Sequence, residues 1–387
     1  MAGTSRRMPM SGSFLAKAAV LLSSIVAAQG CGLLPPSAAD VETAHWNWPC
    51  EALGPIPGPE DIALDQGNGI AYVSSTDRLA VDGRAKPVAA DGSPGRIYRI
   101  DLKADPPKVD DVTPAADGRD FLPQGIDLLD DGMERRLFVV NRRQARDGGI
   151  CGGGGEVQIL SVPTDASPMR RVKTIRDGRL TDPNDVVAVG GDAFYATNST
   201  DAGSCIGQTL GILFARTGGR VLYHGSDGFH NVAGPIEHAN GIAADRMARR
   251  LFAGSTIDGR IHSYEWKGEG PAQPDGRPPV AVGMHADNLF RISDGSLLVA
   301  AHPSLLRFFL YARGMVDTAA TRVLHITPGA DGRQTVREIF ADDGTRLSAG
   351  SSAVLYENGD GSRRRLLIGA VHADHLLVCK GDGRERP

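Results

Sequence analysis

The sequence is poor in aromatic residues and lacks long amphipathic helical patterns. Phe, Trp and Tyr make up 5% of its 387 residues. Basic residues are scattered rather than clustered, and the net charge of −4 argues against a nucleic acid partner. Glycine and proline are abundant instead, at 49 and 24 residues, which is typical of a chain with many short strands and turns. We therefore expect an all-β protein that does not bind nucleic acid.

Two sequence motifs of common enzyme classes are also missing. No Gly-x-Ser-x-Gly motif occurs, so the sequence gives no sign of a serine nucleophile of that type. The glycine run at residues 152–155 lacks the lysine that a phosphate-binding loop requires. Any hydrolytic chemistry must therefore come from another arrangement of residues.

The first 31 residues are typical of an export signal. Positively charged residues precede a mostly apolar core, residues 18–28, which is too short to span a bilayer. The segment Ala-Ala-Gln-Gly-Cys at residues 27–31 is similar to a bacterial lipobox, and cleavage there would leave Cys31 lipidated; cleavage nearby by an ordinary signal peptidase is the alternative. The composition, rich in Ala, Gly, Asp and Arg, is typical of high-GC bacteria. We expect a periplasmic protein, or one anchored to the cell envelope only through Cys31.

The mature chain is predicted to fold as one large domain. Residues 32–44 form a Pro- and Ala-rich tether, residues 45–380 the domain and residues 381–387 a short tail. Short apolar strand patterns recur throughout the domain, and Asp-Gly pairs, a strong hairpin-turn signal, separate many of them.

Four short motifs of acidic and amide residues recur along this domain, and each begins a strand pattern. The last three follow one another at steps of roughly 50 residues, and the first interval is about two such steps. A repeat of this length with several strands per step is typical of a β-propeller, here with six blades, or seven if the loops are short. The motifs are Glu60-Asp61-Ile62, Asn184-Asp185-Val186, Asn240-Gly241-Ile242 and Asp287-Asn288-Leu289.

The position of these motifs at strand starts indicates a metal site. In a propeller the inner strand of every blade starts at one central channel, so side chains from separate blades converge there. A ring of carboxylate and amide oxygens suits calcium. The alternative is that the motifs are ordinary Asx turns that cap strands.

Short strings between Cys50 and Cys379 occur together in the order and spacing of a known family. They are Gly58-Pro59-Glu60-Asp61, Leu122-Pro123-Gln124-Gly125-Ile126, Lys173-Thr174-Ile175-Arg176, Asn184-Asp185-Val186-Val187-Ala188-Val189-Gly190, Phe194-Tyr195-Ala196-Thr197-Asn198, Ala239-Asn240-Gly241-Ile242, Asp287-Asn288 and His302-Pro303. In these strings the chain resembles the paraoxonase and arylesterase family, which are six-bladed propellers with two calcium ions in the central tunnel.

This resemblance implies two sets of calcium ligands. The catalytic ion would be held by Glu60, Asn184, Asn240, Asp287 and Asn288. The structural ion would take Asp61, Asp185 and the backbone carbonyl of Ile126. Neighbouring side chains on a strand point to opposite sides, so adjacent motif residues can serve both ions. The resemblance thus implies a calcium-dependent hydrolase of small lactones or aryl esters, in which calcium polarises the carbonyl and a pocket base activates water.

The chain departs from the family at the residues assigned to general base catalysis. The two family histidines correspond to Gln124 and Arg142, and neither side chain can take a proton from water at neutral pH. His238 and His285 each lie two residues before a predicted ligand, so strand periodicity would turn them toward the pocket. His302 matches a family histidine that lines the same cavity.

The replacement of the two family histidines by Gln124 and Arg142 leaves several alternatives for the chemistry of this site. A ligand carboxylate, Glu60 or Asp287, could act as the base, as in related gluconolactonase-type propellers, and the protein would then be a sugar-lactonase. Arg142 could hold an anionic substrate or a leaving carboxylate, or it could be a solvated charge at the rim. A third reading, from a different class, is a propeller that binds a ligand or protein without catalysis and uses calcium only as a structural element.

The cysteines fit an exported, disulfide-bonded domain. Four remain after Cys31, and they allow three pairings. Cys50 opens the domain and Cys379 nearly ends it, so a bridge between them would close the propeller from N- to C-terminus. Cys151 and Cys205 lie in glycine-rich loops and would form the second pair. The alternative is that one pair consists of two free thiols.

Overall fold

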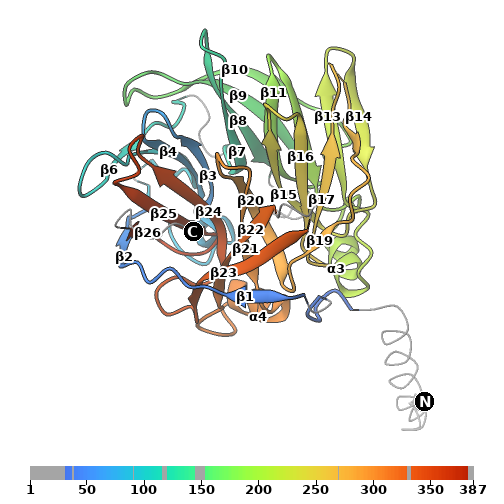
Figure 1. Cartoon of the computed structure of the whole chain (residues 1–387). Helices are drawn as coiled ribbons and strands as arrows, with labels where there is room; N and C mark the ends of the chain where they lie inside the picture. The colour runs from blue at the N-terminus through green and yellow to red at the C-terminus, as the bar shows by residue number, and fades with distance from the viewer. Residues whose placement is uncertain are drawn as a thin grey trace, which may run out of the picture.

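The computed structural model describes residues 31–36, 39–89, 91–115, 120–143, 153–268, 270–328 and 333–381. Its strands form six sheets of four or five strands, and the first strands of the six sheets contact one another in a ring around a central axis, here called the tunnel (Figure 1). The predicted six-bladed β-propeller is therefore confirmed. The predicted signal before Cys31 and the tail after residue 381 lie outside the described residues.

Each of blades 1 to 4 is an antiparallel sheet whose strands follow one another from the tunnel outward. Blade 1 contains β3 (Pro59–Asp65), β4 (Ile70–Thr76), β5 (Gly95–Asp101) and β6 (Lys108–Asp111). Blade 2 contains β7 (Pro123–Asp130), β8 (Arg135–Arg142), β9 (Gly155–Ser161) and β10 (Arg170–Ile175). Blade 3 contains β11 (Pro183–Gly190), β12 (Ala193–Asn198), β13 (Arg220–Gly225) and β14 (Gly228–Ala233). Blade 4 contains β15 (Ala239–Asp245), β16 (Arg250–Ser255), β17 (Arg260–Glu265), β18 (Gln273–Pro274) and β19 (Val280–Ala281), the last two both paired with β17.

Blades 5 and 6 each include a strand from the N-terminal part of the chain. Blade 5 contains β20 (His285–Arg291), β21 (Leu297–His302), β22 (Thr321–Pro328) and β23 (Gln334–Asp342), and β1 (Val41–Thr43) pairs with β23 in parallel. Blade 6 contains β24 (Gly350–Glu357), β25 (Arg364–Ala370), β26 (Leu376–Gly381) and, as its outer strand, β2 (Cys50–Leu53). The end of the predicted tether is therefore part of the propeller through β1.

The disulfide Cys50–Cys379 closes the ring as predicted. The two cysteines are paired residues of β2 and β26, with their Cα atoms 3.9 Å apart. Because the bridge spans 329 residues, it lowers the entropy of the unfolded chain and so stabilises the fold by about 6 kcal/mol in the chain-entropy model. Cys205 is disulfide-bonded, and its predicted partner Cys151 lies outside the described residues. Cys31 is a free cysteine.

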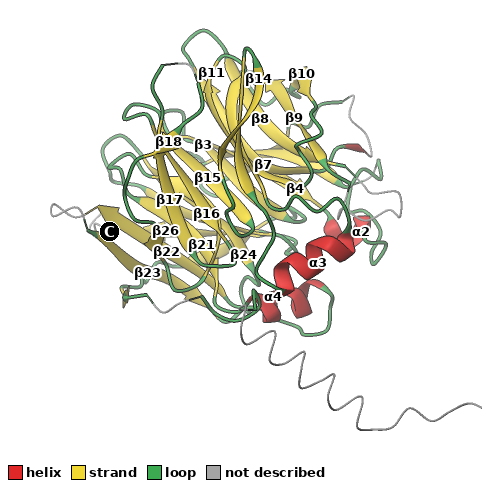
Figure 2. Cartoon of the chain, turned by 90° about the vertical axis from the view of Figure 1, so that its right-hand side faces the viewer, coloured by secondary structure: helices red, strands yellow, loops and turns green. Residues whose placement is uncertain are grey.

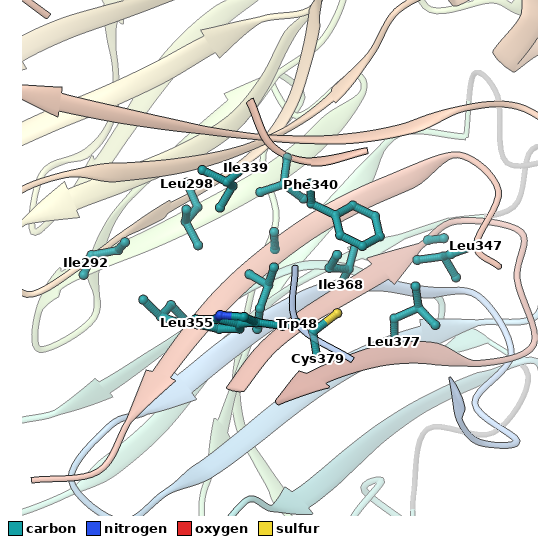
Figure 3. Packing of buried hydrophobic residues seen from close by; sticks show 14 residues of the cluster. Trp48, Ile292, Leu298, Ile339, Phe340, Leu347, Leu355, Ile368, Leu377 and Cys379 are labelled. Atoms are coloured by element: carbon teal, nitrogen blue, oxygen red, sulfur yellow. The ribbon is translucent and has the colours of Figure 1, made fainter. Parts of the chain in front are cut away.

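A hydrophobic cluster joins blades 5 and 6 where the ring closes. Trp48, on the segment between β1 and β2, is buried in this cluster with Leu298 of blade 5 and Ile368 of blade 6 (Figure 3). Cys379 belongs to the same cluster, so the disulfide is covered by apolar side chains. Burial of a large aromatic side chain here contributes to stability through the hydrophobic effect.

The starts of the first strands and the ends of the second strands of all blades lie on one face of the propeller. The first two strands of each blade are antiparallel, so the first strand begins and the second strand ends on the same face, here called the upper face. The helices α2 (Arg78–Val81), α3 (Cys205–Leu213) and α4 (Leu305–Ala312) follow the second strands of blades 1, 3 and 5, and they gather at one end of the molecule (Figure 2). Within the described ranges, no helix is long and apolar enough to cross a membrane.

Candidate metal centre

All six inner strands are irregular at the same place, close to the upper face. Their pairing with the second strand shifts register within the first four residues or so. Such bulges re-aim side chains and are common beside functional sites. The shifts lie between Pro59 and Asp61, Pro123 and Ile126, Pro183 and Val186, Ala239 and Ile242, Ala286 and Leu289, and Gly350 and Ser352. The predicted ligands of the catalytic ion all fall within four of these irregular segments.

Four of the five predicted ligands carry a buried oxygen atom that accepts no hydrogen bond. These atoms are Glu60 Oε2, Asn184 Oδ1, Asn240 Oδ1 and Asn288 Oδ1. Buried polar atoms without a partner are rare in folded proteins because each one costs free energy. Unpaired oxygens on inner strands of four blades are the donor set that a hard cation such as calcium requires. The residues therefore fit a calcium ion.

Hydroxyl groups determine which end of two of these amides carries the unpaired oxygen. Ser199 Oγ donates its only proton to the carbonyl of Ala239 at 2.9 Å, so toward Asn184 it can only accept. The Nδ2 group of Asn184 donates to it at 3.2 Å, which leaves Oδ1 unpaired. Thr256 repeats this pattern in blade 4, where it accepts from Asn240 Nδ2 at 3.0 Å and donates to the next blade.

Two glycines allow the inner strands to approach closely enough to form the donor set. A Cβ atom at Gly125 would lie 2.4 Å from Cα of Asp185, and one at Gly241 would lie 2.5 Å from Cα of Asn288. Both contacts are with backbone, which cannot move aside cheaply. These positions require glycine because neighbouring inner strands come together at the ligand motifs.

The predicted carboxylate ligands of the structural ion connect neighbouring inner strands through hydrogen bonds. Asp61 accepts the N–H of Ile62 at 2.8 Å with one carboxylate oxygen and the N–H of Ile126 at 2.8 Å with the other. Asp185 likewise accepts the N–H groups of Val186 and Ile242. The N–H of Ile126 thus contacts Asp61, while the role predicted for its carbonyl, as a ligand of the structural ion, stays a prediction. A cavity of about 240 Å³, lined by Asp61, Ile126 and Asp185 among others, lies beside these groups.

The carboxylates of the tunnel form a concentration of buried negative charge. Burial, followed by repulsion from Asp61 and Asp287, raises the pKa of Glu60 well above its usual range. Burial raises the pKa of Asp61 to about 7. Burial and the charge of Asp61 raise the pKa of Asp185 well above its usual range. The described residues contain no metal-binding group of three or more His, Cys, Asp or Glu side chains, so an ion here must also use amide oxygens.

The three candidate histidines differ in their hydrogen bonds. His302 Nε2 donates to Asp287 Oδ2 at 2.8 Å, so this ring orients a predicted ligand. His285 is fully buried, and its Nδ1 donates to the carbonyl of Thr256 at 2.9 Å, which leaves the Nε2 lone pair without a partner. His238 is partly exposed, and its buried Nδ1 has no partner.

His238 also has an unusual backbone conformation. It lies directly before β15 with φ at 57°, in the left-handed region that non-glycine residues rarely adopt, and such residues cluster at functional sites. Because it is outside the strand, strand periodicity does not explain its position. Burial lowers its pKa, while Asp182 and Asp287 act in the opposite direction. The imidazole is therefore neutral around pH 7 and able to accept a proton.

The side chains of Gln124 and Arg142 are in direct contact. Arg142 Nη1 donates to Gln124 Oε1 at 3.2 Å, and its Nη2 forms an ion pair with Asp182. A second arginine, Arg78 of α2, donates to the same oxygen at 3.4 Å. The network thus contains two guanidinium groups and no proton acceptor of the imidazole type.

Sequence reasoning missed several residues of this site, including Arg78, Asp182, Ser199 and Thr256. One signal could have found three of them. Arg78, Ser199 and Thr256 each follow the second strand of a blade by one or two residues, and the ends of these strands share the upper face with the starts of the inner strands. Inspecting both ends of each first hairpin would have identified them.

Comparison with known proteins relates the whole domain to one family. The family model described as Arylesterase matches residues 61–380. The chain is 29% identical over 327 residues to serum paraoxonase/arylesterase 2 of Gallus gallus, covering 84% of this chain and 86% of that protein. It is 26% identical to serum paraoxonase/arylesterase 1 of Homo sapiens over 328 residues, with the same coverage. A solved luciferin-regenerating enzyme shares the fold, with a TM-score of 0.53, 12% identity and coverage of 87% of this chain and 96% of that one.

Proposed function

Because the chain belongs to the arylesterase family, we propose that it is a calcium-dependent hydrolase of small esters or lactones. The names of its relatives include arylesterase activity. The observation that carries the proposal is the set of four buried oxygens without hydrogen-bond donors on Glu60, Asn184, Asn240 and Asn288. A bound cation would supply the partner that these four acceptors lack.

The proposed catalytic calcium uses these four residues together with Asp287. Two carboxylates would balance its charge, while the three amides are neutral donors. A calcium ion at this position would polarise the carbonyl of a bound ester or lactone and stabilise the negative charge that develops on its oxygen. Asp61, Asp185 and Ile126 are proposed to hold a second, structural calcium ion, which would offset the repulsion between their buried carboxylates.

We propose His238 as the general base that takes a proton from the attacking water. Its residue is partly exposed, its buried Nδ1 has no hydrogen-bond partner, and both Asp182 and Asp287 are near enough to act on its charge. His285 has a free Nε2 but is fully buried. His302 positions Asp287 through its hydrogen bond rather than acting on water.

A carboxylate base is the second candidate, and the geometry of Gln124 supports it. The oxygen of Gln124 is already occupied by two arginines, so the family position for the base is taken by a group that cannot accept a proton. Glu60 or Asp287 would then act on water, and the protein would work as a sugar-lactonase of the gluconolactonase type. A propeller that binds its ligand without catalysis is the third possibility.

We also propose that the protein is exported from a bacterial cell to the periplasm or to a lipid anchor at Cys31. The disulfide Cys50–Cys379 is consistent with an oxidising compartment. A lipoprotein would carry radioactivity when cells are grown with labelled palmitate, and replacement of Cys31 by serine would remove the label.

An assay of the purified protein against phenyl acetate and a panel of aliphatic and sugar lactones tests the proposed function. We expect hydrolysis that excess EDTA abolishes and added calcium restores. Hydrolysis that EDTA leaves unchanged would contradict calcium dependence. A calcium-binding protein that hydrolyses none of these compounds would support the non-catalytic alternative.

A further inference from the structure

Two arginine side chains share a single neutral acceptor at the upper end of the tunnel. Arg78 and Arg142 both donate to Oε1 of Gln124. The Nε groups of both arginines are buried and have no acceptor. Arg142 is paired with Asp182, whereas Arg78 forms no ion pair within the described part of the chain. Guanidinium donors are therefore in excess over protein acceptors at this position.

The balance of charge around Arg78 depends on the metal. Its charge acts on Glu60, and the carboxylates of Glu60, Asp82 and Asp287 act on it in return. With calcium bound, those two carboxylates neutralise the ion, and Asp182 neutralises Arg142. Arg78 then keeps a positive charge that no ion pair of the described residues neutralises, with the exposed Asp82 as its remaining acidic neighbour. Such a charge, partly removed from water, favours an anionic group that can pair with it.

Aromatic side chains lie next to this positive charge. His372, which follows β25, is close enough to Arg78 and Arg84 that their charges, after burial, lower its pKa to about 3. It is therefore neutral and adds no charge. Its ring contacts Phe308 and Tyr311 of α4, with centroids 6.5 and 6.1 Å apart. All three rings are partly exposed, so they provide an apolar surface beside the guanidinium.

The loop after α2 contacts the end of α4 through a hydrogen bond. Arg84, which follows α2, donates from Nη1 to the carbonyl of Ala312 at the end of α4, at 2.6 Å. Blades 1 and 5 are thus connected across the upper end of blade 6, where His372 lies. The arrangement positions the charge of Arg78 and the aromatic rings relative to each other.

We infer that Arg78, supported by Arg142 through Gln124, binds a carboxylate group on the substrate, so that the protein prefers aromatic or apolar esters and lactones that carry a negative charge. This inference rests on the proposed hydrolase function. A guanidinium recognises a carboxylate by directed N–H donors, and lysine reproduces the charge but not this geometry. Arg78 is therefore a specificity residue, distinct from the base and from the metal ligands.

Binding can be tested without catalysis. On the calcium-loaded protein, we expect benzoate to bind at least tenfold more tightly than benzamide, measured by isothermal titration calorimetry at low ionic strength. Arg78→Gln should abolish this preference and Arg78→Lys should restore part of it. The matched control is Arg216→Gln, which removes one positive charge from an exposed side chain after α3. Equal affinity for benzoate and benzamide, or an unchanged preference in Arg78→Gln, would overturn the inference.

Kinetics separate this inference from the proposed function. We expect kcat/KM for 4-acetoxybenzoate to exceed that for 4-acetoxybenzamide at least tenfold, mainly through KM, and Arg78→Gln to reduce this ratio at least tenfold. A ratio that Arg78→Gln leaves unchanged while both rates fall together would assign Arg78 to positioning Glu60 and would overturn the inference. If neither ester is hydrolysed but benzoate still binds through Arg78, the hydrolase function fails and the carboxylate site stands.

Discussion

The hydroxyl of Thr256 fixes the orientation of the Asn240 amide. Since Thr256 Oγ1 donates to the carbonyl of Ala286 at 2.7 Å, it can only accept from Asn240, whose Nδ2 lies 3.0 Å away. Asn240 Oδ1 is thereby left without a donor in the tunnel wall. Ser199 orients the amide of Asn184 in the same way one blade earlier, so the same pair of hydrogen bonds is repeated in two successive blades.

Removal of this hydroxyl should weaken calcium binding. In Thr256→Val the amide of Asn240 loses its anchor and is free to rotate, so we expect calcium affinity to fall about tenfold to a hundredfold, as is typical for partners of metal ligands. A calcium titration followed by intrinsic fluorescence measures this. Thr209→Val, which alters an exposed hydroxyl of α3, is the control. Equal affinity in Thr256→Val and the wild type would show that Thr256 does not orient a ligand.

A side chain at Gly241 should separate two inner strands. In Gly241→Ala the new methyl group would meet Asn288 Cα at 2.5 Å, so the strands must move apart, at a cost of about 1–3 kcal/mol in the free energy of unfolding. Hydrolysis and calcium binding should fall together. Gly359→Ala is the matched control, since no atom lies within 4 Å of its Cβ position. Denaturant unfolding of both variants provides the comparison, and equal stability would contradict the close approach.

The metal-free protein should become less stable as the pH rises. Asp61 has a pKa of about 7 in the folded protein and about 3.8 in the unfolded chain, so between these values the folded state binds more protons. The stabilisation is complete below about pH 4 and is lost as the pH passes 7. In EDTA we expect the melting temperature to fall between pH 5 and pH 8, and calcium should raise it most at pH 8. A melting temperature in EDTA that rises over this range would contradict the buried charge.

Replacement of the proposed base should change the pH profile. His238→Gln should lower kcat by about 10²- to 10⁴-fold while calcium affinity stays within a few-fold of wild type. Because burial lowers the pKa of His238, the acid limb of kcat/KM in the wild type should lie below pH 6.5 and disappear in the variant. If His238→Gln and His285→Gln retain full activity while Glu60→Gln abolishes it, a ligand carboxylate is the base.

Much of the architecture could be predicted from the sequence because it depends on repetition. The ligand motifs recur once per blade in four blades, and their spacing predicted the six-bladed ring. The pairing of Cys50 with Cys379 followed from their positions at the two ends of the domain. β1 could not be predicted in this way, since its parallel pairing with β23 depends on a contact between residues about 295 apart, Val41 and Val336.

The details of the site were less accessible to sequence reasoning. Strand alternation assumes regular pairing, but all six inner strands shift register at the ligand motifs, so which way a side chain points depends on the bulge. His238 lies outside its strand for a related reason, its left-handed backbone. Arg78 belongs to no repeated motif, and only the fold brings it to the oxygen of Gln124.

The measurement that tests the central claim most directly is isothermal titration of calcium into the chelator-stripped protein. We predict that the wild type binds calcium and that Asn240→Leu, which removes one unpaired oxygen from a side chain of similar shape, loses one binding step or weakens it by at least a hundredfold, with hydrolysis abolished and the fold retained. Absence of calcium binding in the wild type, or binding in Asn240→Leu identical to that of the wild type, would contradict the proposed centre.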